Sequence, residues 1–535
     1  LLLTSPQFGN HSLPPAYHHL IKMEVEKLAE ELEVSLTLGE LQAVVKEGKY
    51  NLVPIYFEMV ADLDTPVTVY LKLNKSKGPK FLFESVAGGE NIARYSFIGV
   101  NPYKIMEFGP DNKCDPLRVI EKELKDINLM PNENIPEFTG GAVGYVGYDC
   151  VRFFEPTVQV PAKKALDIPD CVFSFYSTIV CIDRVNHTIK IINNIPLYRL
   201  NDYEKNGGKG VTIQSLYEDA VRQLNSVREL LEKPIPKRDP VKVGGDGKSQ
   251  SMEDMKSNVG QKGYEGFVDT LKKHIKGGDI IQAVPSQRLM CPLQSVNAFD
   301  LYRELRMINP SPYMFYMDYD SFQVVGASPE LLVKCLNGVV TTHPIAGTRK
   351  RGKTKEADAA LAKELLSNEK ERAEHIMLVD LGRNDVGRVA EPGTVKIDSL
   401  MHIEKYSHVM HIVSHVSGKL AKDKTMYDAF RSVFPAGTVT GAPKVRAMQL
   451  VNGLEPQSRG VYSGAVGHFS FSGNMDTCIA IRTLAVKDGV AHLQAGGGIV
   501  FDSEPTPEYE ETMNKMRALG KAIQQAERMV RKRKR

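Results

Sequence analysis

The stretch YEGFVDTLKKHIKGGDIIQAVPSQR, residues 264–288, joins a predicted helix to a predicted strand. Apolar residues recur at helical spacing over Tyr264–Lys276, and the apolar run Ile280–Arg288 is typical of a strand. Further along, Lys355–Val386 and Pro507–Val530 have the length and periodicity of long amphipathic helices. Helices that alternate with strands in this way predict a mixed α/β fold built on a large sheet.

The first half of the chain is richer in strand signals. Alternating or continuously apolar segments of strand length begin after Tyr50. Thr37 and Glu40 have the spacing of a capping box, which predicts a helix before this region. The predicted strands are Val67–Leu73, Lys80–Glu84, Gly140–Val146, Val172–Tyr176 and Ile189–Ile192, and further predicted helices are Glu24–Leu32 and Ser215–Glu232.

The length of 535 residues suggests more than one domain. The chain becomes polar and rich in Gly, Lys and Pro between Asn201 and Lys256, and Asp239–Ser251 is typical of a linker. Its Gly-Lys-Ser sequence is not a P-loop, because Lys242 occupies the position of the first glycine. The predicted division is an N-terminal extension with short helices (1–45), a first domain (46–200), a helix and linker (201–257), a second domain (258–526) and a basic tail (527–535).

Composition argues against several classes of protein. The chain is 42% hydrophobic and 25% charged, and its net charge of +3 is too small to indicate a nucleic acid or an acidic membrane surface as partner. The seven cysteines include no C-x-x-C pair, so a reducing compartment is expected rather than a disulfide framework or a zinc site. No apolar run reaches the roughly 18 residues of a membrane span, and the N-terminal residues make a poor signal peptide. The expected location is the cytosol.

Two pairs of glutamates have the same spacing. Glu371 and Glu374 lie in one predicted helix, Glu508 and Glu511 open the last one, and each pair projects from one helix face. If the two faces met, their carboxylates would form an all-oxygen site of the kind that Mg²⁺ prefers. Either pair alone is more often a solvated helix face, because surface helices are rich in such spacings.

Two other features suggest a carboxylated ligand, and one histidine is a further candidate for the site. Gly496–Gly498 allow backbone N–H groups to approach an anion, although a tight turn also explains them. Arg482 follows an apolar strand-like segment, where it needs a carboxylate from a substrate or from a structural glutamate. His411 lies in an apolar run, and such a histidine is more often a core residue than a catalyst. Hydrolase and dinucleotide-binding signatures are absent, and nothing indicates an organic cofactor.

Several longer motifs follow one another along the chain. They are Arg94-Tyr-Ser-Phe-Ile-Gly99, Tyr148-Asp-Cys-Val-Arg-Phe-Phe-Glu-Pro156, Gly278-Asp-Ile-Ile-Gln-Ala-Val-Pro-Ser-Gln-Arg288, Asn309-Pro-Ser-Pro-Tyr-Met-Phe315, Pro344-Ile-Ala-Gly-Thr348, Arg372-Ala-Glu-His-Ile-Met-Leu-Val-Asp-Leu-Gly-Arg-Asn-Asp385 and Gly441-Ala-Pro-Lys-Val-Arg-Ala-Met448. Together they strongly resemble the chorismate-utilising enzymes, most of all the component I branch of the anthranilate synthases in its fungal form, from about Pro54 to Ala526. The resemblance implies a two-domain α/β (α+β) fold whose large antiparallel sheets form a β-sandwich core flanked by helices.

The resemblance also implies an active site. Glu374 and Glu511 would bind Mg²⁺, which would hold the ring carboxylate of chorismate, and Glu371 and Glu508 would lie beside them. His411 would help the C4 hydroxyl group to leave. The expected catalytic residues are His411, Thr438, Glu371 and Gln282, and the expected substrate-binding residues are Gly347, Thr348, Tyr462, Arg482, Gly496, Gly497, Gly498 and Lys515.

Two positions differ from those of related enzymes. Aminodeoxychorismate synthases typically carry a nucleophilic lysine where this chain has Ala346, and isochorismate and salicylate synthases carry a lysine base where it has Gln282. Ammonia is already nucleophilic and needs no such base. The resemblance therefore implies that chorismate and ammonia give anthranilate and pyruvate, the first committed step of tryptophan synthesis. An aminodeoxychorismate synthase component I is the nearest alternative, and a non-catalytic tryptophan sensor is a more distant one.

The resemblance implies a partner and an effector as well. The chain has no glutaminase motif with a nucleophilic cysteine, so a separate glutamine amidotransferase subunit is expected to supply ammonia. The first domain is expected to be regulatory, because Phe81-Leu-Phe-Glu-Ser85 resembles the L-L-E-S motif of the family's tryptophan site, from which Phe83 departs. The residues that match contacts to tryptophan are Ser85, Pro312, Tyr313 and Met314, and Cys478 matches a position tied to inhibition.

Overall fold

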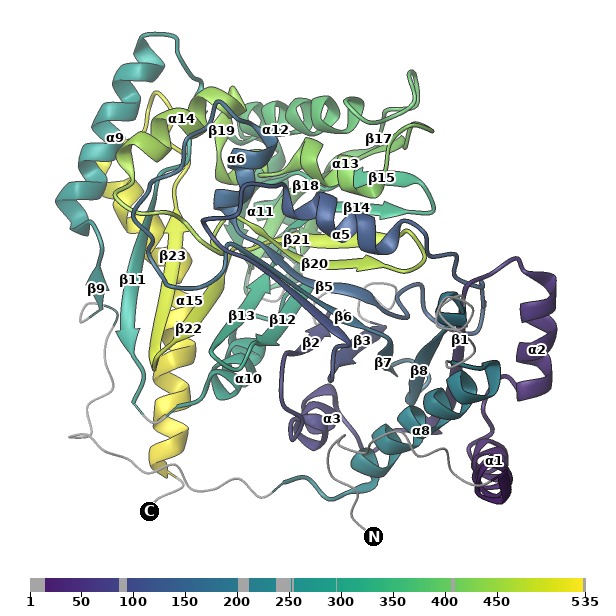
Figure 1. Ribbon diagram of the computed structural model, residues 1–535. Coiled ribbons are helices and arrows are strands. Elements are labelled where there is room, and N and C mark those ends of the chain that lie inside the picture. The colour runs from purple at the N-terminus through teal and green to yellow at the C-terminus, as the bar shows by residue number, and fades with distance from the viewer. Residues whose placement is uncertain are drawn as a thin grey trace.

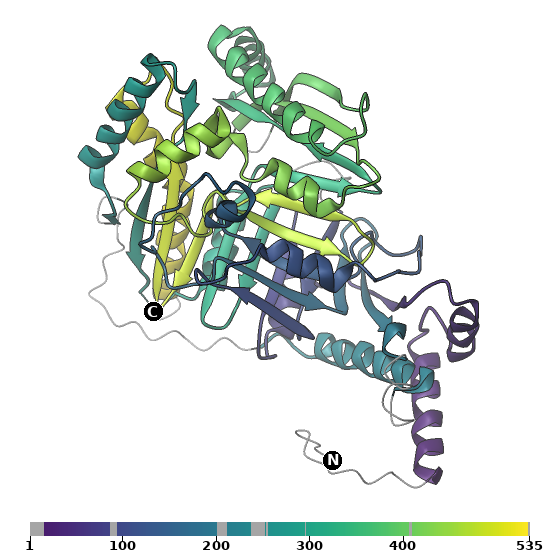
Figure 2. The same ribbon diagram turned by 45° about the horizontal axis from the view of Figure 1, so that its top comes forward.

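Two large antiparallel sheets face each other in the computed structural model, and helices cover the outer side of each sheet (Figures 1 and 2). The linker expected over Asp239–Ser251 lies outside the residues that the structure describes. These are residues 15–85, 94–200, 211–236, 252, 255–294, 296–405 and 409–532.

The first sheet has 11 strands and draws them from both halves of the sequence. Its centre is the pairing of β2 with β12, which places Phe83 opposite Phe315. Across the sheet the strands are β1 (Leu52–Val60), β8 (Thr188–Pro196), β7 (Thr178–Asp183), β3 (Tyr95–Gly99), β2 (Lys80–Glu84), β12 (Tyr313–Asp318), β13 (Phe322–Ser328), β22 (Thr483–Lys487), β23 (Val490–Gly496), β11 (Ser286–Pro292) and β9 (Lys256–Ser257).

The second sheet has 10 strands and also joins the two halves, through the pairing of β5 with β20. A separate two-stranded pair consists of β10 (Gln282–Ala283) and β19 (Gly441–Ala442). The strands of the second sheet are β16 (Ile345–Lys350), β18 (Val409–Lys419), β15 (Val339–Thr342), β14 (Leu331–Leu336), β21 (Met475–Ile479), β20 (Ala465–Ser470), β5 (Gly141–Val146), β6 (Cys171–Tyr176) and β4 (Lys104–Phe108), with β17 (Lys396–Lys405) paired to β18.

Three hydrophobic layers hold these elements together. Aromatic residues such as Tyr145, Tyr176 and Phe315 fill the space between the sheets. A second hydrophobic cluster lies between the first sheet and its helices, and a third lies between the second sheet and its helices. The helices against the first sheet are α1 (Pro15–Glu31), α2 (Leu38–Glu47), α3 (Pro66–Leu73), α8 (Ile213–Glu232), α10 (Ala298–Ile308) and α15 (Pro505–Lys532). The others are α5 (Pro116–Leu124), α6 (Val151–Phe154), α9 (Gly260–Lys276), α11 (Lys355–Ser367), α12 (Glu369–Gly387), α13 (Met426–Val433) and α14 (Lys444–Leu454). This is the β-sandwich flanked by helices that the resemblance implied.

Several local predictions are confirmed. Thr37 caps α2, with its side chain accepting from the backbone N–H of Glu40 in a complete capping box. The predicted strands at Lys80, Gly140, Val172 and Ile189 correspond to β2, β5, β6 and β8. The predicted helices at Ser215, Tyr264 and Pro507 correspond to α8, α9 and α15.

The strand predicted over Val67–Leu73 is wrong, because this segment is helix α3. Thr65 caps the helix and Pro66 occupies its first turn. Proline is tolerated there because backbone N–H groups of the first turn have no partner within the helix. The buried residues of the helix include Pro66, Val69, Tyr70 and Leu73, which share one helix face. The alternation of residue types hid this helical periodicity.

Three predicted boundaries also need correction. The helix expected from Glu24 begins at Pro15. The strand expected over Ile280–Arg288 is divided into β10 and β11 around Pro285, which has no backbone N–H to donate. The long helix expected over Lys355–Val386 is two helices, because Asn368 ends α11 and caps α12.

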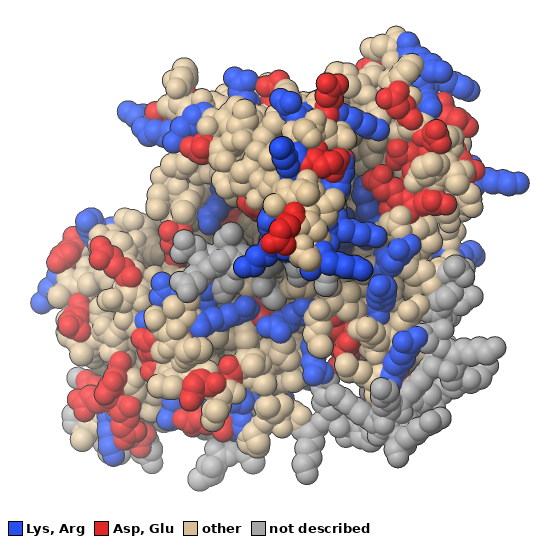
Figure 3. Space-filling model, turned by 180° about the vertical axis from the view of Figure 1, so that it is seen from behind, with Lys and Arg blue, Asp and Glu red and all other residues tan. Residues whose placement is uncertain are grey.

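The two sequence halves share both sheets, so the strands of one half continue those of the other. The predicted domain boundaries remain predictions. None of the helices in the described ranges is long and apolar enough to cross a membrane. All seven cysteines lie in the described ranges, and none of them is in a disulfide. Acidic and basic side chains are mixed over the face seen in Figure 3.

Candidate active site

Glutamates from two helices meet at the carboxyl end of β23. Glu374 on α12 accepts a hydrogen bond from the Gln282 amide, with 3.2 Å between Nε2 and Oε1. On α15, the Lys515 ammonium lies 2.7 Å from Glu511 Oε1 and donates to the Gly496 carbonyl at 2.9 Å. Gln282 also packs against Gly498, so Glu374 of α12 and Glu511 of α15 each have a partner that contacts the same glycine segment. The meeting of the two helix faces, which their spacing alone could not establish, is therefore present.

The three glycines after β23 allow this close packing. A Cβ atom on Gly497 would lie 2.9 Å from Glu508 Oε2, and one on Gly498 would lie 2.4 Å from Gln282 Nε2. A Cβ atom on Gly496 would lie 2.5 Å from the carbonyl oxygen of Pro285. Any larger residue would push the acids and the amide away from the backbone. Of the two interpretations of this segment, close approach is the one that the geometry supports.

His411 on β18 is held by neighbouring β16. Its Nδ1 lies 3.1 Å from the carbonyl oxygen of Gly347 and 3.1 Å from Thr348 Oγ1. A bond to a carbonyl oxygen requires the proton to be on Nδ1. Burial, opposed by this bond and helped by the positive charge of Arg482, lowers the pKa of His411. The imidazole is therefore neutral near pH 7.

Arg482, a predicted substrate-binding residue, is influenced by the charges of several neighbouring side chains. Arg482 was expected at the end of a strand. It lies instead between β21 and β22, with a left-handed φ of 51°. Burial lowers its pKa, while Tyr462, Glu330 and Glu511 raise it through their charges. These residues come from the segment before β20, the segment before β14 and helix α15, so charges from three parts of the chain act on Arg482. A guanidinium in such a place is suited to a carboxylate ligand.

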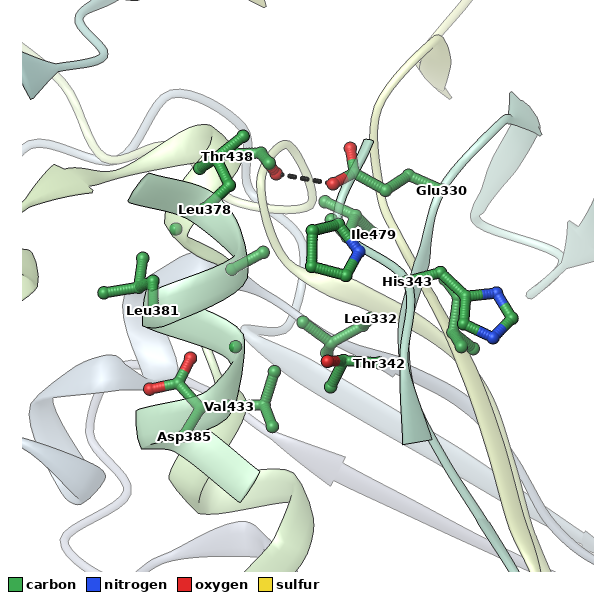
Figure 4. Close-up of a pocket in the computed structure, with 15 residues that line it drawn as sticks. Glu330, Leu332, Thr342, His343, Leu378, Leu381, Asp385, Val433, Thr438 and Ile479 are labelled. Atoms are coloured by element: carbon green, nitrogen blue, oxygen red, sulfur yellow. Dashed lines mark hydrogen bonds between the residues drawn. The ribbon is translucent and has the colours of Figure 1, made fainter. Parts of the chain in front are cut away.

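Glu330, between β13 and β14, is a site residue that the sequence analysis missed. Its carboxyl is buried, and Thr438 Oγ1 donates to its Oε1 at 2.8 Å (Figure 4). Burial raises the pKa of Glu330 to about 7, against the lowering effects of Thr438, Arg482 and Lys515. The sequence did contain a signal for this residue. Glu330 is the one charged residue between Val324 and Val333, and a charged side chain in a mostly apolar segment needs a partner or a function.

The acidic residues fit a hard divalent cation. Burial and the charge of Glu511 raise the pKa of both Glu374 and Glu508. Glu508 Oε2 is buried and finds no hydrogen-bond partner among the described residues. Carboxylates that repel one another in a partly buried space are the donor set that an Mg²⁺ ion neutralises. Two of these acids also have a cationic partner, since Glu371 pairs with Arg349 at 2.9 Å and Glu511 pairs with Lys515 at 2.7 Å.

The sequence of the chain matches a known family over most of its length. The profile described as chorismate binding enzyme matches residues 78–521. The chain belongs to the chorismate-binding enzyme family.

Relatives of this chorismate-binding enzyme include fungal and bacterial proteins. The probable anthranilate synthase component 1 of Schizosaccharomyces pombe is 50% identical over 496 residues, covering 92% of this chain and 97% of the relative. The anthranilate synthase component 1 of Saccharomyces cerevisiae is 48% identical over 502 residues, covering 92% and 96%. The crystal structure of anthranilate synthase component I from Streptococcus pneumoniae has a TM-score of 0.69 and 36% identity, covering 86% and 99%. The menaquinone-specific isochorismate synthase of Escherichia coli shares the fold at 16% identity, with a TM-score of 0.66 and coverage of 90% and 98%.

The residues expected to bind an effector lie together elsewhere in this chorismate-binding enzyme. They line a cavity of about 710 Å³, into which residues of both sheets project. Tyr313 Oη donates to Asp476 Oδ1 at 3.1 Å, and Ser85 Oγ is buried without a hydrogen-bond partner in the described part of the chain. The expected residues that line the cavity are Ser85, Pro312, Tyr313, Met314 and Cys478. The two predicted groups of site residues are thus separate in space.

We predict that the free energy of unfolding falls less with rising pH in Glu330→Gln than in the parent protein. The native enzyme holds a proton on Glu330 up to pH about 7, whereas an unfolded glutamate loses it near 4.5, so the free energy of unfolding falls as pH rises between these values. The variant should lose about 3 kcal/mol less than the parent between pH 5 and 8. Urea unfolding at a series of pH values measures the difference, and parallel curves for the two proteins would contradict the raised pKa.

Proposed function

We propose that this chain is the chorismate-converting subunit of an anthranilate synthase, which forms anthranilate and pyruvate from chorismate and ammonia. The observation that carries the proposal is the amide of Gln282, which donates to Glu374 at the point where a water-activating enzyme of this fold needs a base. Ala346 on β16 pairs with Ile412 and offers no nucleophile either. A site with these two residues suits a nucleophile that needs no deprotonation. The names of the relatives with 50% and 48% identity support the same reaction.

The proposed reaction has two steps. Nitrogen of ammonia forms a bond to C2 of chorismate while the bond from C4 to its hydroxyl oxygen breaks and the ring double bonds shift. The hydroxyl group takes up a proton and leaves as water, and the nitrogen loses one proton. In the second step C2 loses its proton and the bond from C3 to the enolpyruvyl oxygen breaks, which makes the ring aromatic. The enolpyruvyl group leaves as an enolate and takes up a proton to become pyruvate.

Charges in the site match the charges of this substrate. The cations of Arg482 and Lys515 are suited to the two carboxylates of chorismate. Glu330, which retains its proton up to a pH of about 7, is suited to protonate the leaving hydroxyl group, and its bond from Thr438 fixes its position. The neutral ring of His411 and the hydroxyl of Thr348 add polar groups to the same site. Mg²⁺ bound by Glu374 and Glu511 would neutralise the ring carboxylate and draw electron density toward it.

A second subunit is part of the proposal. The relatives are numbered as component 1, which supports the presence of another component. We propose that this partner is a glutamine amidotransferase that delivers ammonia to the site of this chain, because the sequence has no glutaminase motif with a nucleophilic cysteine. We propose that the protein acts in the cytosol, and seven cysteines without a disulfide are consistent with that compartment.

The proposed reaction predicts fluorescence from anthranilate. The pure chain, incubated with chorismate, Mg²⁺ and an ammonium salt, should produce anthranilate and pyruvate in equal amounts without any partner. Fluorescence of anthranilate and an enzymatic assay of pyruvate measure the two products. Accumulation of an aminated chorismate that retains its enolpyruvyl group would instead favour an aminodeoxychorismate synthase, and the absence of any product would favour a sensor.

We predict that Glu511→Gln lowers kcat at least about 100-fold, because an amide removes one negative charge from a hard-cation site. The neighbouring Glu510→Gln is the matched control, since Glu510 is exposed on the same turn of α15 and should leave kcat unchanged. Steady-state assays over a range of Mg²⁺ concentrations measure both variants. Near-normal turnover of Glu511→Gln at low Mg²⁺ would contradict the metal assignment.

We further propose that the cavity of about 710 Å³ binds tryptophan and that its occupation inhibits the enzyme. Two features support a ligand of this kind. The buried Ser85 hydroxyl, which finds no hydrogen-bond partner among the described residues, is suited to a polar main-chain group of an amino acid. The lining residues Phe83, Phe97 and Phe138 are suited to an aromatic ring.

We predict that Ser85→Ala raises the tryptophan concentration for half-inhibition about tenfold, which corresponds to the loss of one hydrogen bond. Turnover without tryptophan should stay close to that of the parent, because Ser85 lies outside the group formed around Arg482. Ser226→Ala, on the outer helix α8, is the control and should change neither value. Equal inhibition of Ser85→Ala and the parent would remove this residue from the effector site.

A further inference from the structure

A second group of ionisable side chains lies on the ribbon formed by β17 and β18. His402 and Glu404 are on β17, and His415 is on β18. One possible ligand atom from each of the three lies within 4.8 Å of the others. Nε2 of His402 is 3.2 Å and Nε2 of His415 is 3.7 Å from the same oxygen, Glu404 Oε1. Two imidazoles and one carboxylate therefore converge on one point.

Neighbouring side chains hold both rings in this orientation. Nδ1 of His402 lies 2.8 Å from Ser399 Oγ, so the nitrogen on the far side of the ring faces Glu404. The ring of His343 stacks on that of His415, with 4.0 Å between centroids and 14° between planes. A hydrogen bond or a packed ring that orients the histidine is usual at metal sites, where it fixes the ring before the ion arrives.

An ordinary ion pair does not account for the whole group. A bond between His402 and Glu404 uses one imidazole, at 3.2 Å. The second distance, 3.7 Å from His415 to the same carboxylate oxygen, is too long for a hydrogen bond. Nε2 of His415 is buried and has no hydrogen-bond partner within the described ranges. A cation bound by all three side chains would give this nitrogen a partner.

The donor atoms indicate the class of ion. Mg²⁺ prefers oxygen ligands, as in the pair Glu374 and Glu511, whereas imidazole nitrogen suits Zn²⁺ and its neighbours among the transition metals. Two histidines and one carboxylate are a common ligand set for such ions, with the remaining positions open to water or another ligand. We propose that His402, Glu404 and His415 form a site for a divalent transition-metal ion, of which Zn²⁺ is the best match.

The position of this transition-metal site relates it to two features described above. Glu404 pairs with His411 across the ribbon, so the site lies on the strands that also hold the active-site histidine. Glu404, His415 and His343 are among the residues that line the cavity of about 710 Å³. An ion there would fasten β17 to β18 and close off that part of the cavity to a ligand approaching the histidines.

Titration of the full-length chain with Co²⁺ tests the site. The chain is first treated with a chelator and then kept in excess Mg²⁺, which occupies oxygen-ligand sites. We expect one equivalent of Co²⁺ to bind and to give visible absorption bands, which Zn²⁺ abolishes and Mg²⁺ does not. His415→Ala and His402→Ala should each weaken binding at least tenfold, because each removes one of three protein ligands.

Control variants separate this site from others on the chain. His274→Ala removes a histidine that is paired with Asp279 at 2.7 Å, and it should leave Co²⁺ binding unchanged. Glu511→Gln should leave it unchanged as well. If His415→Ala does not fold, His402→Ala decides, since its side chain is 35% exposed. Unchanged Co²⁺ binding in His402→Ala, or loss of binding in Glu511→Gln, would overturn the proposal.

Discussion

Glu84 holds the two halves of the sequence against each other. Its buried carboxylate on β2 accepts hydrogen bonds from Tyr302 at 2.6 Å and Arg306 at 3.0 Å, both on α10, and from Arg184 at 2.6 Å. A buried carboxylate is stable only with such partners, and the removal of one leaves charge unpaired in the interior. Ser85, at the effector cavity, follows directly in the chain. Because α10 packs against α15, the helix of Glu511, this group of contacts gives a packed path from the cavity to the proposed metal ligands.

The active site depends on a second constraint, which is close approach of backbone to side chain. The Glu508 carboxylate of α15 packs against the backbone of Gly497, and the Gln282 amide of β10 packs against Gly498 and donates to Glu374 of α12. The charge of Glu511 helps raise the pKa of Glu374 and Glu508, so a cation bound there, as we propose, would reduce the repulsion among these acids.

The parts of this arrangement that the sequence predicted are local. The i, i+3 spacing of Glu508 and Glu511 and the capping box at Thr37 depend on neighbours a few residues away, and helix geometry determines them. The meeting of α12 and α15 was expected only through the family resemblance. Glu330 was missed because its partner Thr438 lies 108 residues further along. The segment Val67–Leu73 was assigned to the wrong element because residue type alternates there, while the burial that decides between strand and helix is a property of the packed structure.

Electrostatics also distinguishes two residues of the candidate site as proton donors. A proton donor must still carry its proton at the working pH, and its pKa should lie near that pH. His411 was expected to donate, but its lowered pKa and the bond from Nδ1 to the Gly347 carbonyl describe a neutral ring whose one proton is already shared. Glu330, with a pKa of about 7, meets the requirement at neutral pH. These pKa shifts favour Glu330 as the donor to the leaving hydroxyl group in the proposed reaction, and the role expected of His411 stays a prediction.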